Sequence, residues 1–126
     1  MGNLKELKIV IAEDSKLISD VLTRTLSGVE GLRVVGLAEN GIEALELVRE
    51  REPHLLVLDI SMPLKDGIEV LRELRAENSA TVIVLFTAES NPFAKKVCMD
   101  LGADYYLDKS QVGELVEICS LHLLAL

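Results

Sequence analysis

The sequence contains no tryptophan, and aromatic residues make up only 3% of its 126 residues. Apolar residues nevertheless account for 49% of the chain, so the core must be aliphatic and built from Leu, Val, Ile and Ala. This composition is typical of a buried parallel sheet, whose central strands are apolar on both faces. The length favours one domain over residues 1–126, because a chain of this size can build one core but not two.

Basic charge and long apolar runs are also scarce. The chain has 13 Lys and Arg against 21 Asp and Glu, a formal net charge of −8, and no basic run longer than Lys95-Lys96. Because contacts to nucleic-acid phosphates need clustered basic side chains, we expect no direct nucleic-acid binding by this chain. The longest apolar run, residues 82–86, is far shorter than a membrane span, and the N-terminus lacks the pattern of a signal peptide. We therefore expect a cytoplasmic protein that does not associate with membranes.

The cysteines and histidines are few and isolated. Cys98 and Cys119 lie far apart and neither has a second cysteine beside it, so neither a zinc site nor a disulfide framework is indicated. We interpret them as reduced thiols within helices. His54 and His122 have no neighbouring residues of a ligand type, and we assign them no chemistry.

Short aliphatic runs alternate with segments of helical periodicity along the whole chain. The expected strands are residues 7–12, 32–38, 54–60, 81–86 and 104–108. The expected helices are residues 17–26, 41–52, 67–78, 91–102 and 113–126. This alternation predicts an α/β fold, a doubly wound five-stranded parallel sheet with right-handed crossovers and five helices. With the second strand at an outer edge, the strand order is 2-1-3-4-5.

Polar side chains follow four of the expected strands, at the point where each strand ends. Glu13 and Asp14 follow the first strand, Asp59 the third, Thr87 the fourth and Lys109 the fifth. In an open parallel sheet, ligands bind outside the carboxyl ends of the strands, where the strand order reverses. In the order 2-1-3-4-5, we expect these five side chains to line one pocket.

Most of these residues also have a purely structural interpretation. Asp14 could cap the first helix, Thr87 could be an ordinary β-former, and Lys109 could be a solvated surface charge. Asp59 is harder to explain in this way, because clustered carboxylates resist joint ionisation unless a cation balances them. The turn after the second strand, residues 39–41, is expected to contribute little chemistry.

Three carboxylates in one pocket would form an oxygen-rich site for a hard divalent ion. Mg²⁺ favours a few carboxylates together with water and a phosphoryl oxygen. The same negative charge argues against binding of a bare nucleotide phosphate, and no glycine-rich phosphate loop follows the first strand. A carboxylate can also attack phosphorus and form an aspartyl phosphate. Asp59 is the candidate nucleophile, with Mg²⁺ and Lys109 neutralising the phosphoryl oxygens while Thr87 donates a hydrogen bond to one of them.

Four motifs, in this order, resemble the receiver domain of two-component response regulators over residues 7–121. They are the Glu13-Asp14 pair, "LLVLDISMPLKDGIEVL" with Asp59, "VLFTA" with Thr87, and "GADYYLDKS" with Lys109. The resemblance implies a flavodoxin-like fold. It also implies that a sensor histidine kinase or a phosphotransfer protein phosphorylates Asp59 in a Mg²⁺-dependent reaction, in which Mn²⁺ can substitute. Such a domain is a phosphoacceptor of signal transduction and phosphorelays that catalyses its own phosphorylation and dephosphorylation, and is not a conventional turnover enzyme.

The resemblance also implies a ligand set for the metal. Asp14, Asp59 and the backbone carbonyl of Ser61 would bind the ion directly, and Glu13 would act through water. Glu13 stands where the family often has Asp, so its carboxylate reaches one methylene further. Lys109 is followed by Ser110 where many members have a cis proline. A cis bond before a residue other than proline costs about 3 kcal/mol, and the sequence leaves the isomer of this bond open.

Further positions match residues that control output and lifetime in the family. Thr87 and Tyr106 match its switch pair, while Ser61 and Glu89 match positions that tune the lifetime of the phosphorylated form. The resemblance implies that a second copy of the chain or an output protein binds the face formed by the fourth helix, the fifth strand and the fifth helix.

Two other functions compete with this interpretation. An aspartate-nucleophile phosphatase would carry a second Asp two residues after the nucleophile, where this chain has Ser61. A receiver-like interaction module that is not phosphorylated would lack residues of the site, whereas this chain has all of them. The sequence is compatible with a stand-alone regulator and with a domain of a longer protein.

Overall fold

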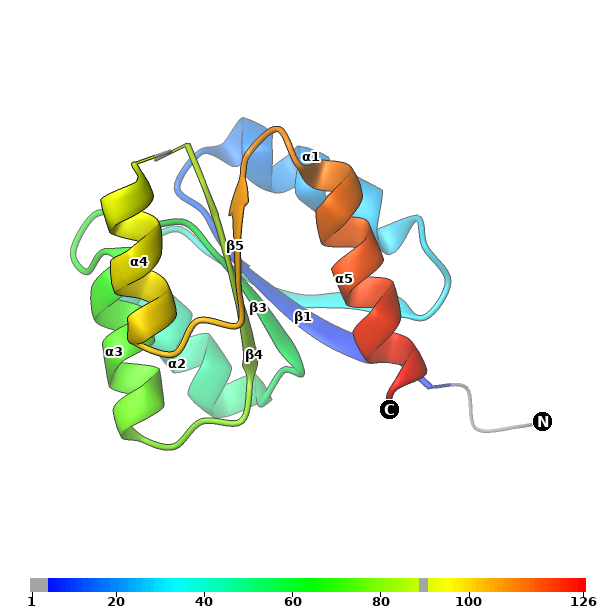
Figure 1. Ribbon diagram of the computed structural model, residues 1–126. Helices are drawn as coiled ribbons and strands as arrows, with labels where there is room; N and C mark the ends of the chain where they lie inside the picture. The colour runs from blue at the N-terminus through cyan, green and yellow to red at the C-terminus, as the bar shows by residue number, and fades with distance from the viewer. Residues whose placement is uncertain (1–4, 89–90) are drawn as a thin grey trace.

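The structure, a computed structural model, describes residues 5–88 and 91–126 and contains one five-stranded parallel sheet (Figure 1). The strand order is β2-β1-β3-β4-β5, as the sequence predicted. The strands are β1 (Leu7–Ala12), β2 (Leu32–Ala38), β3 (Leu55–Leu58), β4 (Val82–Thr87) and β5 (Tyr105–Asp108). The helices are α1 (Lys16–Ser27), α2 (Gly41–Arg51), α3 (Gly67–Ala76), α4 (Pro92–Asp100) and α5 (Val112–Leu124).

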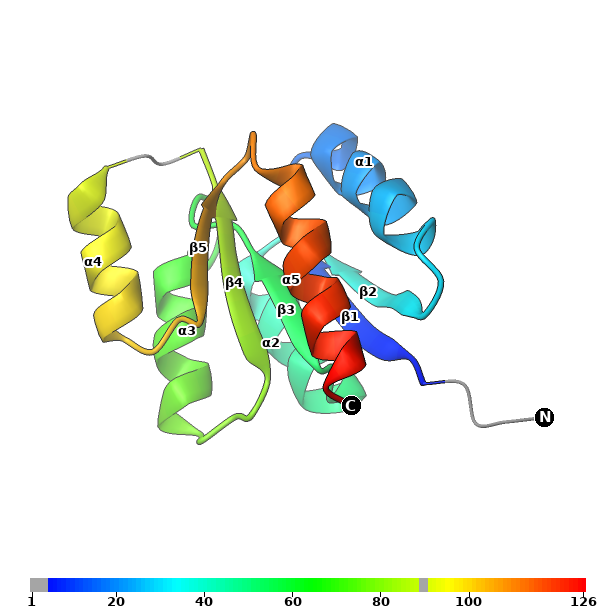
Figure 2. The same cartoon turned by 45° about the vertical axis from the view of Figure 1, so that its right-hand side comes forward.

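The helices form two layers, one on each face of the sheet. Figure 2 shows α1 and α5 on one face, with α2, α3 and α4 on the other. Alternate residues of β1 explain this arrangement: Ile9 and Ile11 belong to the core under α1 and α5, whereas Val10 belongs to the core under α2 and α3. A central strand must therefore be apolar at every position. Cys98 and Cys119 are buried and reduced, and they belong to the cores on opposite faces.

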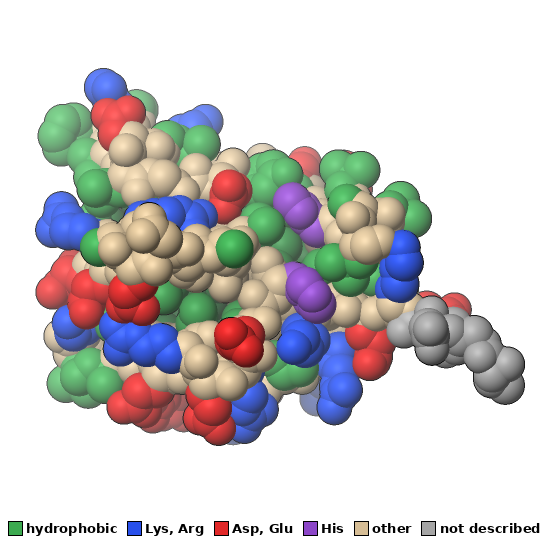
Figure 3. Space-filling model, turned by 90° about the horizontal axis from the view of Figure 1, so that it is seen from below, with side chains coloured by type: hydrophobic (Ala, Val, Ile, Leu, Met, Phe, Trp, Pro, Cys, Tyr) green, Lys and Arg blue, Asp and Glu red, His purple; other side chains and the backbone are tan. Residues whose placement is uncertain are grey.

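The pole formed by the amino ends of the strands carries both histidines (Figure 3). The side chain of His54 accepts a hydrogen bond at Nδ1 from the backbone N–H of Lys8 at 2.8 Å. Burial lowers the pKa of His54, so the neutral ring that can accept this bond is favoured. His122 contacts the Tyr105 hydroxyl through Nε2 at 3.0 Å. Both rings therefore connect structural elements, on the side of the sheet away from the carboxylates.

In residues 5–88 and 91–126, no helix is both long enough and apolar enough to cross a bilayer.

Candidate functional site

Three carboxylates gather at the carboxyl ends of β1 and β3. Glu13, Asp14 and Asp59 each have an oxygen within 4.8 Å of the others. The strand register produces this proximity: Ala12 of β1 lies opposite Leu58 of β3, so the residues that follow emerge side by side. The Asp59 N–H continues the pairing by donating to the Ala12 carbonyl at 3.1 Å. Glu13 and Asp59 are each only 3% exposed, whereas Asp14 is open to solvent.

Lys109 balances the two buried carboxylates. Its Nζ lies 2.8 Å from Glu13 Oε1 and 2.9 Å from Asp59 Oδ2. Burial by itself would lower the pKa of Lys109, but the contacts with Glu13 and Asp59 outweigh it, so the pKa is raised and the ammonium form is favoured. The pKa of Glu13 is also raised, because loss of hydration outweighs the hydrogen bonds from Lys109 and from the Ser15 N–H. The site therefore holds strongly interacting charges at close quarters.

The acidic cluster fits a magnesium ion. Asp59 Oδ1 is buried and accepts no hydrogen bond from the residues that the structure describes, whereas Oδ2 is paired with Lys109. A buried carboxylate oxygen with no partner is costly, and a cation at this position would remove that cost. Together with the exposed Asp14, it offers the oxygen donors that Mg²⁺ prefers.

The N-terminal cap of α1 is Ser15, so the interpretation of Asp14 as the cap is wrong. The hydroxyl oxygen of Ser15 accepts a hydrogen bond from the Ile18 N–H at 3.4 Å. The Ser15 N–H donates to Glu13 Oε2 at 2.9 Å, which holds the Glu13 side chain against the start of the helix. The Asp14 carboxylate is thus not needed to cap the helix and remains at the site.

The other predicted residues lie on β4, β5 and the loops that follow them. Thr87 ends β4, is 1% exposed and lies opposite Asp108 of β5. Tyr106 lies one strand away, opposite Leu85, and is half-buried against the core on the α2–α4 face. The peptide bond between Lys109 and its successor is trans, as are all peptide bonds in the described part of the chain.

Ser61 is exposed, two residues after Asp59. Glu89 lies outside the described residues.

Sequence reasoning missed two glycines beside the site. Gly67 packs on the backbone of Asp59, and a Cβ on it would lie 2.2 Å from the Asp59 carbonyl oxygen. Gly41, in the turn that was expected to add little, packs in the same way on the Lys65 carbonyl. The available clue was the placement of glycine at the first position of two helices. Glycine weakens a helix, so its presence there indicates that close packing excludes a side chain.

Comparison with known proteins gives a family match. Residues 9–120 match the model of the response regulator receiver domain. The response regulator GacA of Pseudomonas aeruginosa is 36% identical over 104 residues, which cover 82% of this chain and 48% of that protein. The response regulator MprA of Mycobacterium ulcerans is 38% identical over 103 residues, covering 82% of this chain and 44% of that protein. The chain spans about half the length of the curated relatives it matches.

Solved structures resemble the fold over nearly the whole chain. The signal receiver domain of the putative response regulator NarL from Mycobacterium tuberculosis superposes with a TM-score of 0.89 at 29% identity, covering 94% of this chain and 97% of that one. The BeF3-activated receiver domain of Klebsiella pneumoniae RstA gives a TM-score of 0.84 at 30% identity, with coverages of 92% and 97%.

Replacing Lys109 by Met should lower the free energy of unfolding by about 2 kcal/mol at neutral pH, because Glu13 and Asp59 would stay buried without their cation. We expect less than for a fully buried pair, since the Lys109 side chain is 22% exposed. The loss should shrink as the pH falls toward 4.5, the usual pKa of Glu, because protonation of Glu13 removes the repulsion. Added Mg²⁺ should restore part of the stability. Urea unfolding at several pH values measures these effects.

Lys96→Met is the matched control, because Lys96 forms an exposed pair with Asp100 in which the side chains are 72% and 65% exposed. Its stability should change by less than about 0.5 kcal/mol. Equal losses in the two variants would contradict the assignment of Lys109 as the counter-ion.

Proposed function

We propose, from the premise that this chain belongs to the family of response regulator receiver domains, that Asp59 accepts a phosphoryl group from a sensor histidine kinase or a phosphotransfer protein. One observation carries the assignment of Asp59. Its carboxylate is buried between the acidic pair that follows β1 and the ammonium of Lys109, yet its Oδ1 has no hydrogen-bond partner among the described residues. An oxygen in this position has lone pairs available for a metal ion or for phosphorus.

Phosphoryl transfer forms a bond between an Asp59 carboxylate oxygen and phosphorus. The phosphorus–nitrogen bond of a phosphohistidine breaks, and the imidazole nitrogen leaves with the electron pair. Lys109, already in contact with the carboxylate, supplies positive charge to the phosphoryl oxygens. Thr87, from the neighbouring strand, donates a hydrogen bond from its hydroxyl to one of them.

We assign the metal ligands as Asp14, Asp59 and the backbone carbonyl of Ser61, with Glu13 acting through water. When bound, Mg²⁺ supplies positive charge beside the transferred phosphoryl group, and Mn²⁺ can substitute for it. The acidic cluster of Glu13, Asp14 and Asp59 supports this assignment. The affinity should be weak, because Lys109 already neutralises part of the charge.

The alternatives receive less support. A phosphatase of the aspartate-nucleophile type needs a general acid two residues after Asp59, and Ser61 lacks an ionisable group near neutral pH. An interaction module without phosphorylation would not need the buried charge cluster. We therefore favour a self-phosphorylating and self-dephosphorylating signalling domain over residues 1–126, acting in the cytoplasm. With a net charge of −8, this chain would not bind nucleic acid directly.

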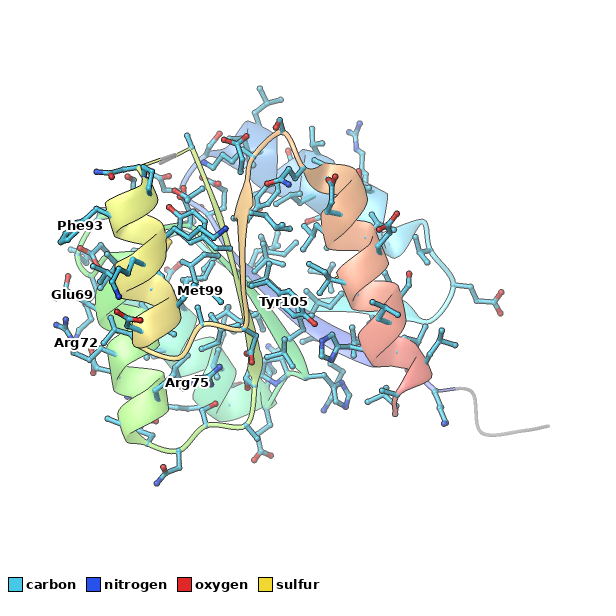
Figure 4. All side chains as sticks on the ribbon, viewed as in Figure 1. Glu69, Arg72, Arg75, Phe93, Met99 and Tyr105 are labelled. Carbon is cyan, nitrogen blue, oxygen red and sulfur yellow. The ribbon has the colours of Figure 1, made fainter. Side chains whose placement is uncertain are left out.

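The output surface that we propose comprises α4, β5 and α5. Figure 4 shows Phe93 and Met99 projecting from α4, and Tyr105 from β5. Phe93 is 72% exposed and Met99 40% exposed, so α4 presents two large apolar side chains to solvent on this surface. A second copy of the chain or an output protein would bind here.

Incubation with acetyl phosphate and Mg²⁺ should add the mass of one phosphoryl group to the wild-type chain, and Asp59→Asn should abolish this gain. Asp14→Asn should also prevent it, because the metal would lose a direct carboxylate ligand. Intact-mass spectrometry over time measures both results. Asp100→Asn, at the exposed end of α4, is the control and should react like the wild type. If Asp14→Asn reacts at the wild-type rate, the metal assignment is wrong.

The lifetime of the phosphorylated form should depend on Ser61 and Glu89, which match the positions that tune this lifetime in the family. Ser61 is small and exposed, so it leaves the phosphoryl group accessible. Replacing both residues with Leu should slow hydrolysis, and a phosphate-release assay measures the rate. Ser27→Leu, at the exposed end of α1, serves as the control. An unchanged rate in the double variant would rule out this role.

Phosphorylation should also turn the Tyr106 ring. As Thr87 moves toward a phosphoryl oxygen, it opens space next to Tyr106, and the ring rotates inward and alters the face formed by α4, β5 and α5. We expect the beryllofluoride adduct to change the NMR signals of the Tyr106 ring and of the amides of residues 88–110. The ring of His54, which accepts the Lys8 N–H at the amino ends of the strands, should change little and is the internal control. Identical Tyr106 signals in both forms would exclude the switch.

A further inference from the structure

Two neighbouring helices begin with nearly the same sequence, Asn-Gly-Ile-Glu at residues 40–43 and Asp-Gly-Ile-Glu at residues 66–69. The Asn40 and Asp66 side chains cap α2 and α3, each accepting a backbone N–H three residues later at 2.9 Å. The glycine that follows each cap is buried. Glycine costs a helix about 1 kcal/mol relative to alanine, so its presence at both positions indicates a need for space.

Both glycines press on the backbone of the segment that leads from Asp59 to α3. A Cβ on Gly67 would lie 2.2 Å from the Asp59 carbonyl oxygen and 2.8 Å from Ile60 Cα. A Cβ on Gly41 would lie 2.2 Å from the Lys65 carbonyl oxygen and 2.5 Å from Lys65 Cβ. Residues 60–66 are therefore held at both ends by contact with the first residue of a helix. A residue with a side chain could not make either contact at this distance.

The segment between these contacts has a strained conformation. Lys65 donates its N–H to the Pro63 carbonyl at 2.8 Å, which closes a γ-turn around Leu64. Leu64 has a φ of +69°, a left-handed conformation that is unfavourable for a residue with a branched side chain. Its side chain is 72% exposed, so packing of that side chain does not hold the turn in place. Strained turns persist where the surroundings over-determine them.

The surroundings here are α2 and α3, which lie side by side on one face of the sheet (Figure 2). Arg49 of α2 forms ion pairs with Glu73 of α3 and with Glu77, the residue that follows α3. The Lys65 side chain is itself paired with Glu73. Because these pairs hold α2 against α3, added bulk at Gly41 would press directly on the Lys65 backbone and shift residues 60–66.

We propose that Gly41 is a positioning residue for the metal site. Its close contact with Lys65 fixes the backbone of residues 60–66, and with it the Ser61 carbonyl, at the place where the ion binds. This inference rests on the proposed function, because it takes the Ser61 carbonyl as a ligand. The turn after β2 therefore contributes to the site because Gly41 has no side chain.

The test is Gly41→Ala, with Mg²⁺ binding followed by NMR titration of the unphosphorylated protein. We expect the dissociation constant for Mg²⁺ to rise about tenfold or more, as is common when a residue that supports a metal ligand is lost. The matched control is Gly113→Ala, a second glycine in the first turn of a helix, whose added Cβ would meet no atom within 4 Å. Its affinity for Mg²⁺ should equal that of the wild type. Thermal unfolding of both variants without metal separates an effect on affinity from an effect on stability.

A second measurement on the wild-type protein decides the matter if Gly41→Ala does not fold. Because coupling between two sites is reciprocal, Mg²⁺ should slow hydrogen exchange at the Gly41 amide, whose N–H faces the Pro63 carbonyl at 3.5 Å. The Gly113 amide should be unaffected.

The outcomes distinguish this inference from the proposed function. Wild-type affinity in a folded Gly41→Ala, or loss of stability without loss of affinity, overturns the role of Gly41 while the phosphoacceptor function stands. Unchanged exchange at Gly41 on Mg²⁺ binding overturns it as well. A wild-type protein that neither binds Mg²⁺ nor takes up a phosphoryl group overturns the proposed function itself.

Discussion

Two carboxylates buried side by side require a cation, and much of the site follows from this constraint. The register of β1 and β3 brings Glu13 and Asp59 together, where neither can be fully hydrated. The balancing charge comes from β5, two strands away from β3, which is about 10 Å at the usual spacing of strands. Lys109 has the long side chain that this distance requires, and the bond from its N–H to the Thr87 carbonyl continues the pairing of β4 and β5.

The contacts of Lys109 with both carboxylates also affect how a metal ion would bind at this site. Lys109 contacts oxygens of both Glu13 and Asp59, so an arriving divalent ion shares ligands with a resident charge and does not enter an uncompensated acidic pocket. Compensation reduces the electrostatic gain from binding the metal. It also keeps the fold from depending on the metal, since the buried carboxylates are already paired.

The fold was accessible from the sequence because its pattern is redundant. Five apolar runs, separated by segments of helical periodicity, predict a doubly wound sheet, and the order of strands follows from the side chains that must meet. The third strand was predicted too long, as residues 54–60, because an apolar pattern does not show where the ladder ends. β3 stops at Leu58, where the backbone turns into the loop of the site.

Details that depend on competition between neighbours were not accessible. Asp14 and Ser15 are both good caps, and only the structure shows that Ser15 fills this role. Gly41 looked like an ordinary turn residue, since its contact is with Lys65, 24 positions further along the chain. A pattern of residue types identifies which edge of the sheet carries the chemistry. It does not reveal contacts between backbone atoms, because every residue has the same backbone.

The strand order has a consequence for the assembly of the domain during folding. Each pair of neighbouring strands is parallel, so every pairing must wait for a crossover connection to close. The union of β1 with β3 spans the longest stretch, since β2 and its two flanking helices lie between them; the contact of Lys8 with His54 joins residues 46 apart. Closing such a loop is slow and entropically costly. A nascent chain that ends after α2 lacks both β3 and Asp59, so the negative charges come together only once the centre of the sheet has formed. The repulsion between Glu13 and Asp59 therefore arises only when β1 and β3 pair, and Lys109, the residue that balances it, follows later in the chain.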